Sequence, residues 1–85
     1  MTSQETIVNL ESGLHARPAA RFVQIAKGFK SKLKIDYNGK SADPKSILGL
    51  LSLNVNKGSI ISISADGEDE VQAVEALTAF TQETE

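Results

Sequence analysis

The sequence predicts an α+β fold in which helices cover one face of an antiparallel sheet. Several segments alternate apolar and polar residues, as half-buried strands do, and two longer segments repeat apolar residues at helical spacing. The pair Asn38-Gly39 is typical of the tight turn between antiparallel strands. Because strands with one polar face need cover on the other face only, the helices are expected on one side of the sheet, in the order β-α-β-β-α-β-α.

The first part of the chain contains a strand and a helix. The strand is predicted over residues 6–10, with inward positions at Thr6, Val8 and Leu10 that alternate with Ile7 and Asn9. The helix is predicted over residues 16–27, with a buried stripe of Ala19, Phe22, Val23 and Ala26. Pro18 suits the first turn, where its missing N–H costs nothing, and Gly28 is expected to end the helix in the left-handed conformation.

A hairpin and a short helix follow. A strand with inward residues at Leu33, Ile35 and Tyr37 leads through a type I′ turn into a short strand near residues 40–42. The short helix is predicted over residues 47–53 and begins after Ser46, a residue type favoured at the N-cap position.

The last part of the chain predicts a fourth strand and a third helix. The strand carries Ile61, Ile63 and Ala65 and follows a turn at Lys57-Gly58. The helix is predicted over residues 69–83, with a buried stripe of Ala73, Val74, Leu77, Phe80 and Thr81. The acids Glu68, Asp69 and Glu70 are favourably placed at its positive end. Carboxylate pairs such as Glu68 with Glu70 are interpreted as a solvated helix start, not as a catalytic acid and base.

Length and composition limit the possible functions. The 85 residues, 40% of them hydrophobic, suit one small domain spanning residues 1–85. Without cysteine and with one histidine, the chain offers neither a disulfide framework nor clustered imidazole or thiolate ligands, so no metal or cofactor is expected. The sequence has no signal-peptide pattern and no apolar run of about 18 residues. We therefore expect a cytoplasmic location without membrane insertion.

The net charge of −2 conceals an uneven distribution. Residues 12–45 hold eight of the nine Lys and Arg, whereas residues 66–85 hold seven acids and no basic residue. Four cations in the basic part could steer acidic partner proteins: Arg17, Arg21, Lys27 and Lys45. The simpler interpretation, ordinary solubilising charge, is favoured for Lys30, Lys32, Lys34 and Lys40. Nucleic acid is not an expected partner, because the basic part lacks interleaved aromatic residues and the whole chain is acidic.

The chain's only histidine lies in the segment Gly13-Leu14-His15-Ala16-Arg17-Pro18-Ala19, where the first helix is predicted to begin. Free backbone N–H groups and the positive end of the helix dipole gather there, which favours a bound anion and a neutral, nucleophilic ring. Arg17 adds a planar charged fork that can hold a phosphate by two hydrogen bonds. Together these features predict a phosphohistidine. Spacing alone favours a simpler interpretation, in which His15 is a surface residue at a helix end and Arg17 is a solvated charge.

The segment around His15 closely resembles the active-site signature of HPr, the histidine-containing phosphocarrier of the bacterial sugar phosphotransferase system. The resemblance covers the whole chain and includes the stretches 38–40, 45–53 and 65–70. It implies an open-faced β-sandwich, with strand order 1-4-2-3 under three helices. It also implies a phosphoryl carrier and not an independent enzyme. Enzyme I would load His15 on ring atom Nδ1, Arg17 and the backbone N–H groups of Ala16 and Arg17 would steady the phosphoryl group, and an enzyme IIA component would receive it.

The stretch 45–53 resembles the regulatory-serine segment of the HPr type found in bacteria with an HPr kinase/phosphorylase. The resemblance implies that this kinase modifies Ser46 and that the modified form binds a transcriptional regulator of carbon catabolite control. The N-cap role would by itself explain a serine at this position, and the two roles can coexist. A phosphate there would add about two negative charges at a helix N-terminus, where the dipole tolerates them.

The short helix is unusually apolar. Its five large apolar residues cannot share one stripe, so Ile47, Leu48 and Leu51 are expected to form an exposed patch, although a wedged helix could bury most of them. The resemblance implies that partners dock on this helix. Leu48 and Leu51 stand where the kinase-regulated type usually has methionines, Pro44 stands where a non-proline is usual, and Arg21 replaces a residue that is more often neutral. These departures could narrow partner choice, alter kinase recognition and strengthen contact with an acidic partner, respectively.

Three alternatives to the sugar carrier remain. One is a regulatory binding module like the HPr paralogue Crh, which lacks the active histidine and acts through phosphoserine. Another is a paralogue that serves a nitrogen-linked phosphorelay. The third is a structural or ligand-binding domain without phosphorylation, which would leave the paired histidine and serine motifs as coincidence.

Overall fold

The computed structural model describes residues 1–83. Its elements are β1 (Thr2–Ile7), α1 (Ala16–Lys27), β2 (Lys32–Tyr37), β3 (Lys40–Ala42), α2 (Ile47–Leu53), β4 (Ile60–Asp66) and α3 (Glu70–Thr81). This order confirms the predicted α+β class. Within residues 1–83, no helix is long and apolar enough to span a bilayer.

The four strands form one antiparallel sheet in the order β1-β4-β2-β3. The register places Thr6 opposite Ile61 and Ile35 opposite Ile63, so inward residues of neighbouring strands meet on one face. The β2–β3 hairpin turns at Asn38 and Gly39 with φ of 53° and 81°. Both values are positive, as the predicted type I′ turn requires.

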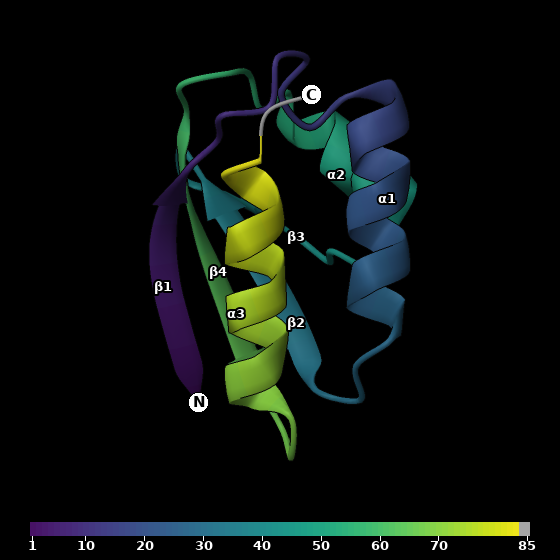
Figure 1. Cartoon of the computed structure of the whole chain (residues 1–85), viewed down its shortest axis with the longest axis vertical. Coiled ribbons are helices and arrows are strands. Elements are labelled where there is room, and N and C mark those ends of the chain that lie inside the picture. Colours follow the sequence, from purple (N-terminus) through teal and green to yellow (C-terminus); the bar gives the residue numbers. More distant parts are fainter. Residues whose placement is uncertain (84–85) are drawn as a thin grey trace.

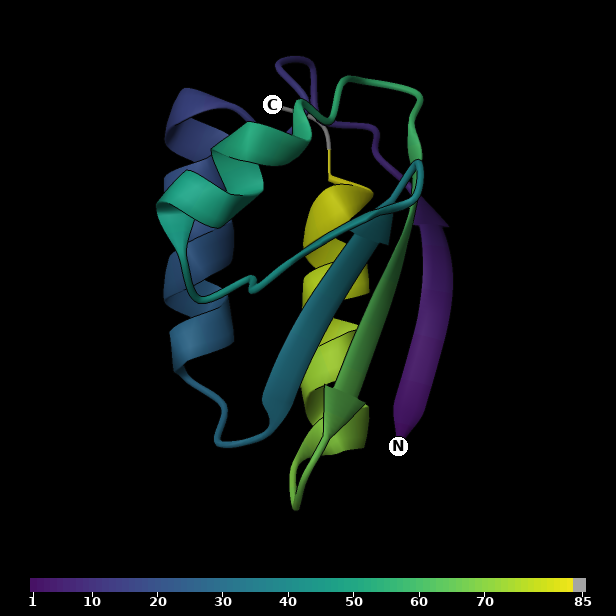
Figure 2. The same cartoon turned by 180° about the vertical axis from the view of Figure 1, so that it is seen from behind.

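The three helices lie on one side of the sheet (Figures 1 and 2). Helix α3 packs directly on β1 and β4, while α1 contacts both α2 and α3. The core between the layers combines inward residues of the strands with the predicted helical stripes, and its largest fully buried members include Phe22, Leu10, Leu14, Ile35 and Leu50. Within the described residues 1–83, no helix lies on the opposite face of the sheet (Figure 2).

The first strand differs from its prediction. It spans Thr2–Ile7 instead of residues 6–10, although Val8 and Leu10 are buried as expected. The strand starts early because its first residues pair with the end of β4, from Thr2 opposite Ala65. It ends early because the Asn9 N–H donates to the carbonyl of Thr81 at 2.7 Å, which directs the chain away from the sheet toward α3.

The helix ends also differ in part. The left-handed cap predicted at Gly28 is wrong, since Gly28 has φ −74° and the helix closes with right-handed turns. The N–H groups of Gly28 and Phe29 donate to the carbonyls of Ile25 and Ala26, so the last carbonyls are satisfied without a positive φ. Helix α3 spans Glu70–Thr81, shorter than the predicted 69–83, and its predicted stripe is buried.

The acids at the start of α3 are not simply solvated. One Asp69 oxygen accepts from the N–H of Lys30 at 2.8 Å, and the other accepts from the N–H and the hydroxyl of Ser31. Glu70 accepts a hydrogen bond from the Thr2 hydroxyl at 2.6 Å. Asp69 therefore ties the α1–β2 loop to α3, and Glu70 ties the first strand to α3.

Asp69 is expected to make the stability of the fold depend on pH in the acidic range. The Ser31 hydroxyl and the Lys30 N–H hold the pKa of Asp69 below its usual value of 3.8. A lowered native pKa contributes stability that is complete above the unfolded value and is lost as the pH falls through the native value. Asp69→Asn is expected to lower the urea midpoint at neutral pH, and the gap from the unmodified protein should shrink below about pH 4. An unchanged gap at low pH would contradict this.

Candidate functional site

His15 stands at the N-cap of α1 and is partly exposed. Its backbone is extended, with φ −121° and ψ 156°, and the next residue, Ala16, has a positive φ of 48°. A left-handed conformation costs an L-residue about 1 kcal/mol, and here it turns the chain from the loop into the helix. The predicted helix start is confirmed, and the ring lies where the first N–H groups of α1 have no helical acceptor.

The backbone before His15 belongs to one of two loops that lie at the same end of the molecule and are bonded to each other (Figure 1). These are residues 8–15, the His15 loop, and residues 54–59, which link α2 to β4. Backbone hydrogen bonds join them, from Leu14 N to the Val55 carbonyl at 2.9 Å and from Gly58 N to the Val8 carbonyl at 2.7 Å. An ion pair between Lys57 and Glu11 at 2.8 Å adds a side-chain link. The loop before the histidine is therefore braced along its length.

The imidazole forms a hydrogen bond with a residue of the second loop. His15 Nε2 lies 3.1 Å from Asn56 Oδ1, a hydrogen bond between residues 41 positions apart. Nothing in local sequence spacing pointed to Asn56, because only the tertiary pairing of the two loops brings it to the ring. The nearest signal was the Lys57-Gly58 turn, which places a loop before β4 without locating its side chains.

The other predicted members of the site lie along α1. Arg17 is exposed, and within residues 1–83 its guanidinium meets no carboxylate or other acceptor. It begins the same helix as His15, so the structure brings these two residues to one end of α1. Lys27 ends that helix, about 18 Å along the axis from His15 at the usual rise per residue. Lys27 therefore does not belong to the immediate surroundings of the ring.

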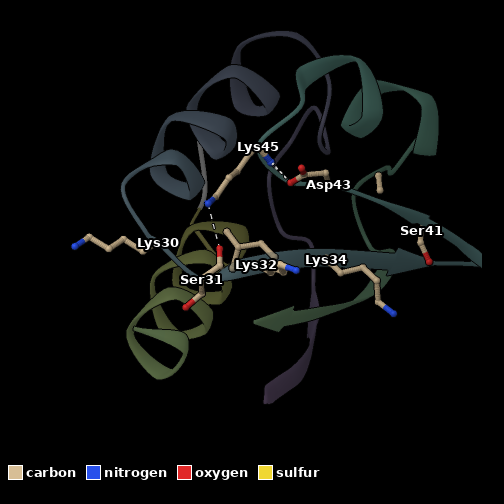
Figure 3. Close-up of a pocket in the computed structure, with 9 residues that line it drawn as sticks. Lys30, Ser31, Lys32, Lys34, Ser41, Asp43 and Lys45 are labelled. Carbon is tan, nitrogen blue, oxygen red and sulfur yellow. Dashed lines mark hydrogen bonds between the residues drawn. The ribbon is translucent and has the colours of Figure 1, made fainter. Parts of the chain in front are cut away.

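Two cations expected to steer partners have contacts within the fold. The Arg21 guanidinium lies over the ring of Phe80, 5.7 Å from its centroid, and so joins α1 to α3. The Lys45 ammonium donates to the carbonyl of Phe29 at 2.9 Å and to that of Ser31 at 3.1 Å. Figure 3 shows the second of these hydrogen bonds. Both side chains therefore stabilise the fold, and less of their charge is available to a partner.

A shallow hollow of about 490 Å³ lies between β2 and the segment before α2 (Figure 3). Lysines line it, but Lys30 and Lys34 point in opposite directions and Lys45 is bound to carbonyls. These three lysines therefore do not converge on one point where an anion could bind. Among residues 1–83, no three His, Cys, Asp or Glu side chains are grouped to hold a metal ion.

Helix α2 presents the expected apolar patch. Ile47, Leu48 and Leu51 are 40%, 77% and 38% exposed, whereas Leu50 and Leu53 are buried. The prediction of exposure is confirmed, because the seven-residue helix buries only the side that faces the core. We name Ile47, Leu48 and Leu51 the α2 patch.

Ser46 is the N-cap of α2, as predicted, and its exposed hydroxyl oxygen accepts from Gly49 N at 3.3 Å. The residues before it form a turn, in which Ser46 N donates to the Asp43 carbonyl at 2.9 Å. Pro44 occupies the second position of this turn, where its fixed φ is favourable. The turn therefore explains structurally why a proline fits at position 44.

The structure is an open-faced sheet under three helices, with a partly exposed histidine at a helix N-terminus. The chain matches the family PTS-HPr, described as the PTS HPr component phosphorylation site, over residues 2–83, and it belongs to the HPr/Crh family. The family that the resemblance indicated is confirmed, and the sheet has the strand order 1-4-2-3 that the resemblance implied.

Individual relatives agree with this assignment. The phosphocarrier protein HPr of Haemophilus influenzae is 49% identical over 80 residues, which cover 94% of each chain. The HPr-like protein Crh of Bacillus subtilis is 47% identical over 83 residues, which cover 98% of each. The crystal structure of an HPr from Bacillus anthracis superposes with a TM-score of 0.94 at 43% identity, covering 95% of this chain and 96% of that one.

Proposed function

We propose that His15 accepts a phosphoryl group from phospho-enzyme I and passes it to the enzyme IIA component of a sugar permease in the cytoplasm. The observation that carries this proposal is the position of the chain's only histidine at the N-terminus of α1, inside the match to a phosphorylation-site family. The protein would act as a carrier, because enzyme I supplies the phosphoryl group and a second protein receives it.

The chemistry needs a nucleophile and a positive surrounding. A ring nitrogen of His15 attacks phosphorus, while the guanidinium of Arg17 and the backbone N–H groups of Ala16 and Arg17 hold the phosphoryl oxygens. The exposure of Arg17 and its lack of an acceptor within residues 1–83 support this role. The first turn of α1 offers its N–H groups and dipole to the same anion.

The test is the intact mass of the protein after incubation with enzyme I and phosphoenolpyruvate. One added phosphate that brief acid treatment removes is expected, because phosphohistidine is acid-labile whereas phosphoserine is not. Protein that gains no phosphate during the incubation with enzyme I and phosphoenolpyruvate would overturn the carrier function. If an HPr kinase with ATP still labelled Ser46, the regulatory Crh-like alternative would replace it.

We further propose that partners dock on the α2 patch beside His15. The support is the exposure of three large apolar side chains on one short helix that packs against α1. Arg17, Arg21 and Lys27 on α1 and Lys45 before α2 would supply the charged surroundings for an acidic partner. Arg21 and Lys45 would act from the positions in which Phe80 and the loop carbonyls hold them.

Leu48→Ser tests this surface. We expect affinity for enzyme I to fall about tenfold, because most of a leucine side chain would be lost from the interface. The free energy of unfolding should change by no more than about 0.5 kcal/mol, since Leu48 is exposed. Titration calorimetry and urea unfolding measure the two effects. Val71→Ser is the matched control, because Val71 is 50% exposed on α3, away from the patch; an equal loss in both variants would contradict the proposal.

We propose that an HPr kinase/phosphorylase phosphorylates Ser46 for regulation. A catabolite-control transcriptional regulator would then bind the phosphorylated form. The exposed hydroxyl of Ser46 and its position next to the α2 patch support this. The 47% identity to a Crh protein supports a regulatory role as a second function of the same chain. Ser46→Ala should abolish labelling by the kinase and leave acid-labile labelling by enzyme I intact.

A further inference from the structure

We infer that Asn56 is a positioning residue for His15, and that its carbonyl oxygen holds the neutral imidazole in the form that carries hydrogen on Nε2. This inference rests on the proposed function, because the positioned atom is the nucleophile of phosphoryl transfer. The side chain of Asn56 lies on the 54–59 loop, outside the sequence segment that contains His15.

The argument begins with the donor and the acceptor. Asn56 Oδ1 lies 3.1 Å from His15 Nε2, and a carboxamide oxygen has lone pairs but no hydrogen to give. The shared hydrogen therefore belongs to Nε2. A neutral imidazole carries hydrogen on one nitrogen only, so Nδ1 has the free lone pair. The hydrogen bond thus selects which nitrogen can attack phosphorus.

The Asn56 backbone is itself held in place. Its N–H donates to the Ser59 hydroxyl at 3.3 Å, and its carbonyl accepts from the Ser59 N–H at 3.1 Å. The preceding residue, Val55, is buried and accepts from Leu14 N. The acceptor oxygen therefore belongs to a loop that is hydrogen-bonded to the backbone next to His15. Because both ends of the contact are held, one hydrogen bond can orient the ring.

The same contact acts throughout the transfer. As the Nδ1–phosphorus bond forms, the bond from phosphorus to the donor atom breaks and its electron pair stays with the donor. The hydrogen on Nε2 is not moved, so the ring gains a positive charge that lies beside the Asn56 oxygen. A fixed dipole aimed at developing charge stabilises it without reorganisation. Asn56 therefore favours loading of His15 as well as orienting it.

The test is nitrogen NMR of ¹⁵N-histidine-labelled protein without phosphate, at a pH where the ring is neutral. In the unmodified protein we expect Nε2 to show the shift of a protonated nitrogen and Nδ1 that of an unprotonated one. In Asn56→Leu both shifts should move toward those of a tautomer mixture, and the initial rate of loading by enzyme I should fall about fivefold, as expected for one lost hydrogen bond. Asn56→Asp keeps an acceptor oxygen and should keep the Nε2–H form.

Lys57→Ala is the matched control, because it removes the ion pair with Glu11, a second side-chain link between the two loops, without touching the ring. Its nitrogen shifts should equal those of the unmodified protein. Unchanged shifts in Asn56→Leu, or the same change in Lys57→Ala, would overturn the positioning role even if loading became slower. Failure of the unmodified protein to accept phosphate would instead overturn the proposed function, and the nitrogen shifts would still decide whether Asn56 sets the tautomer.

Discussion

His15→Ala is expected to abolish acid-labile phosphorylation by enzyme I and phosphoenolpyruvate completely. The chain has no second histidine, and alanine offers no lone pair to phosphorus. Arg17 and the first turn of α1, the proposed anion-binding surroundings, would remain, but no side chain there could form the covalent bond to phosphorus. Intact mass spectrometry under the conditions that load the unmodified protein measures the loss.

This variant should still fold, which keeps the result interpretable. The His15 ring is partly exposed, and its hydrogen bond to Asn56 is exposed as well, so the free energy of unfolding should fall by no more than about 1 kcal/mol. Labelling of Ser46 by an HPr kinase serves as an internal check that the partner surface survives. Acid-labile phosphate on the variant would show that another residue carries it and would contradict the role of His15.

Much of the fold could be predicted from the sequence because its signals are local. The alternation in β2 and β4, the helical stripes and the Asn38-Gly39 turn each depend on residues within one element, and the structure confirms them. The bounds of β1 could not be predicted, because the hydrogen bond from Asn9 to α3 ends the strand across a separation of 72 positions. The left-handed cap predicted at Gly28 was wrong because right-handed turns there provide donors for the last carbonyls of α1.

Part of the candidate site could also be predicted from local sequence, and part of it could not. His15, Arg17 and Ser46 are marked by their positions at helix starts, which local sequence reveals. The hydrogen bond of Asn56 and the engagement of Lys45 with two carbonyls depend on loops that meet only in the folded chain. The sequence therefore indicated His15 as the candidate phosphoryl acceptor, whereas the structure was needed to reveal its hydrogen bond to Asn56.

Gly13→Ala should be the most destabilising change near the site, lowering the free energy of unfolding by about 3 kcal/mol. Gly13 has φ 64°, a conformation that disfavours any side chain, and a Cβ there would meet the Val55 carbonyl and lie 2.7 Å from Asn56 Cα. Both contacts are backbone, so neither can rotate away. The two loops must separate to admit the methyl group, which would weaken the Leu14–Val55 hydrogen bond and displace Asn56 from His15.

Gly58→Ala separates the two causes, because Gly58 has a similar φ of 89° but open space where its Cβ would lie. It should cost only the conformational strain, about 1 kcal/mol, and leave loading of His15 unchanged. Gly13→Ala should cost more in urea unfolding and also slow loading, since only this change moves the acceptor of the histidine. Equal destabilisation of both variants would mean that the His15 loop yields to the methyl group at little cost. The close approach of Gly13 to the Val55–Asn56 backbone would then not be what holds His15 in place.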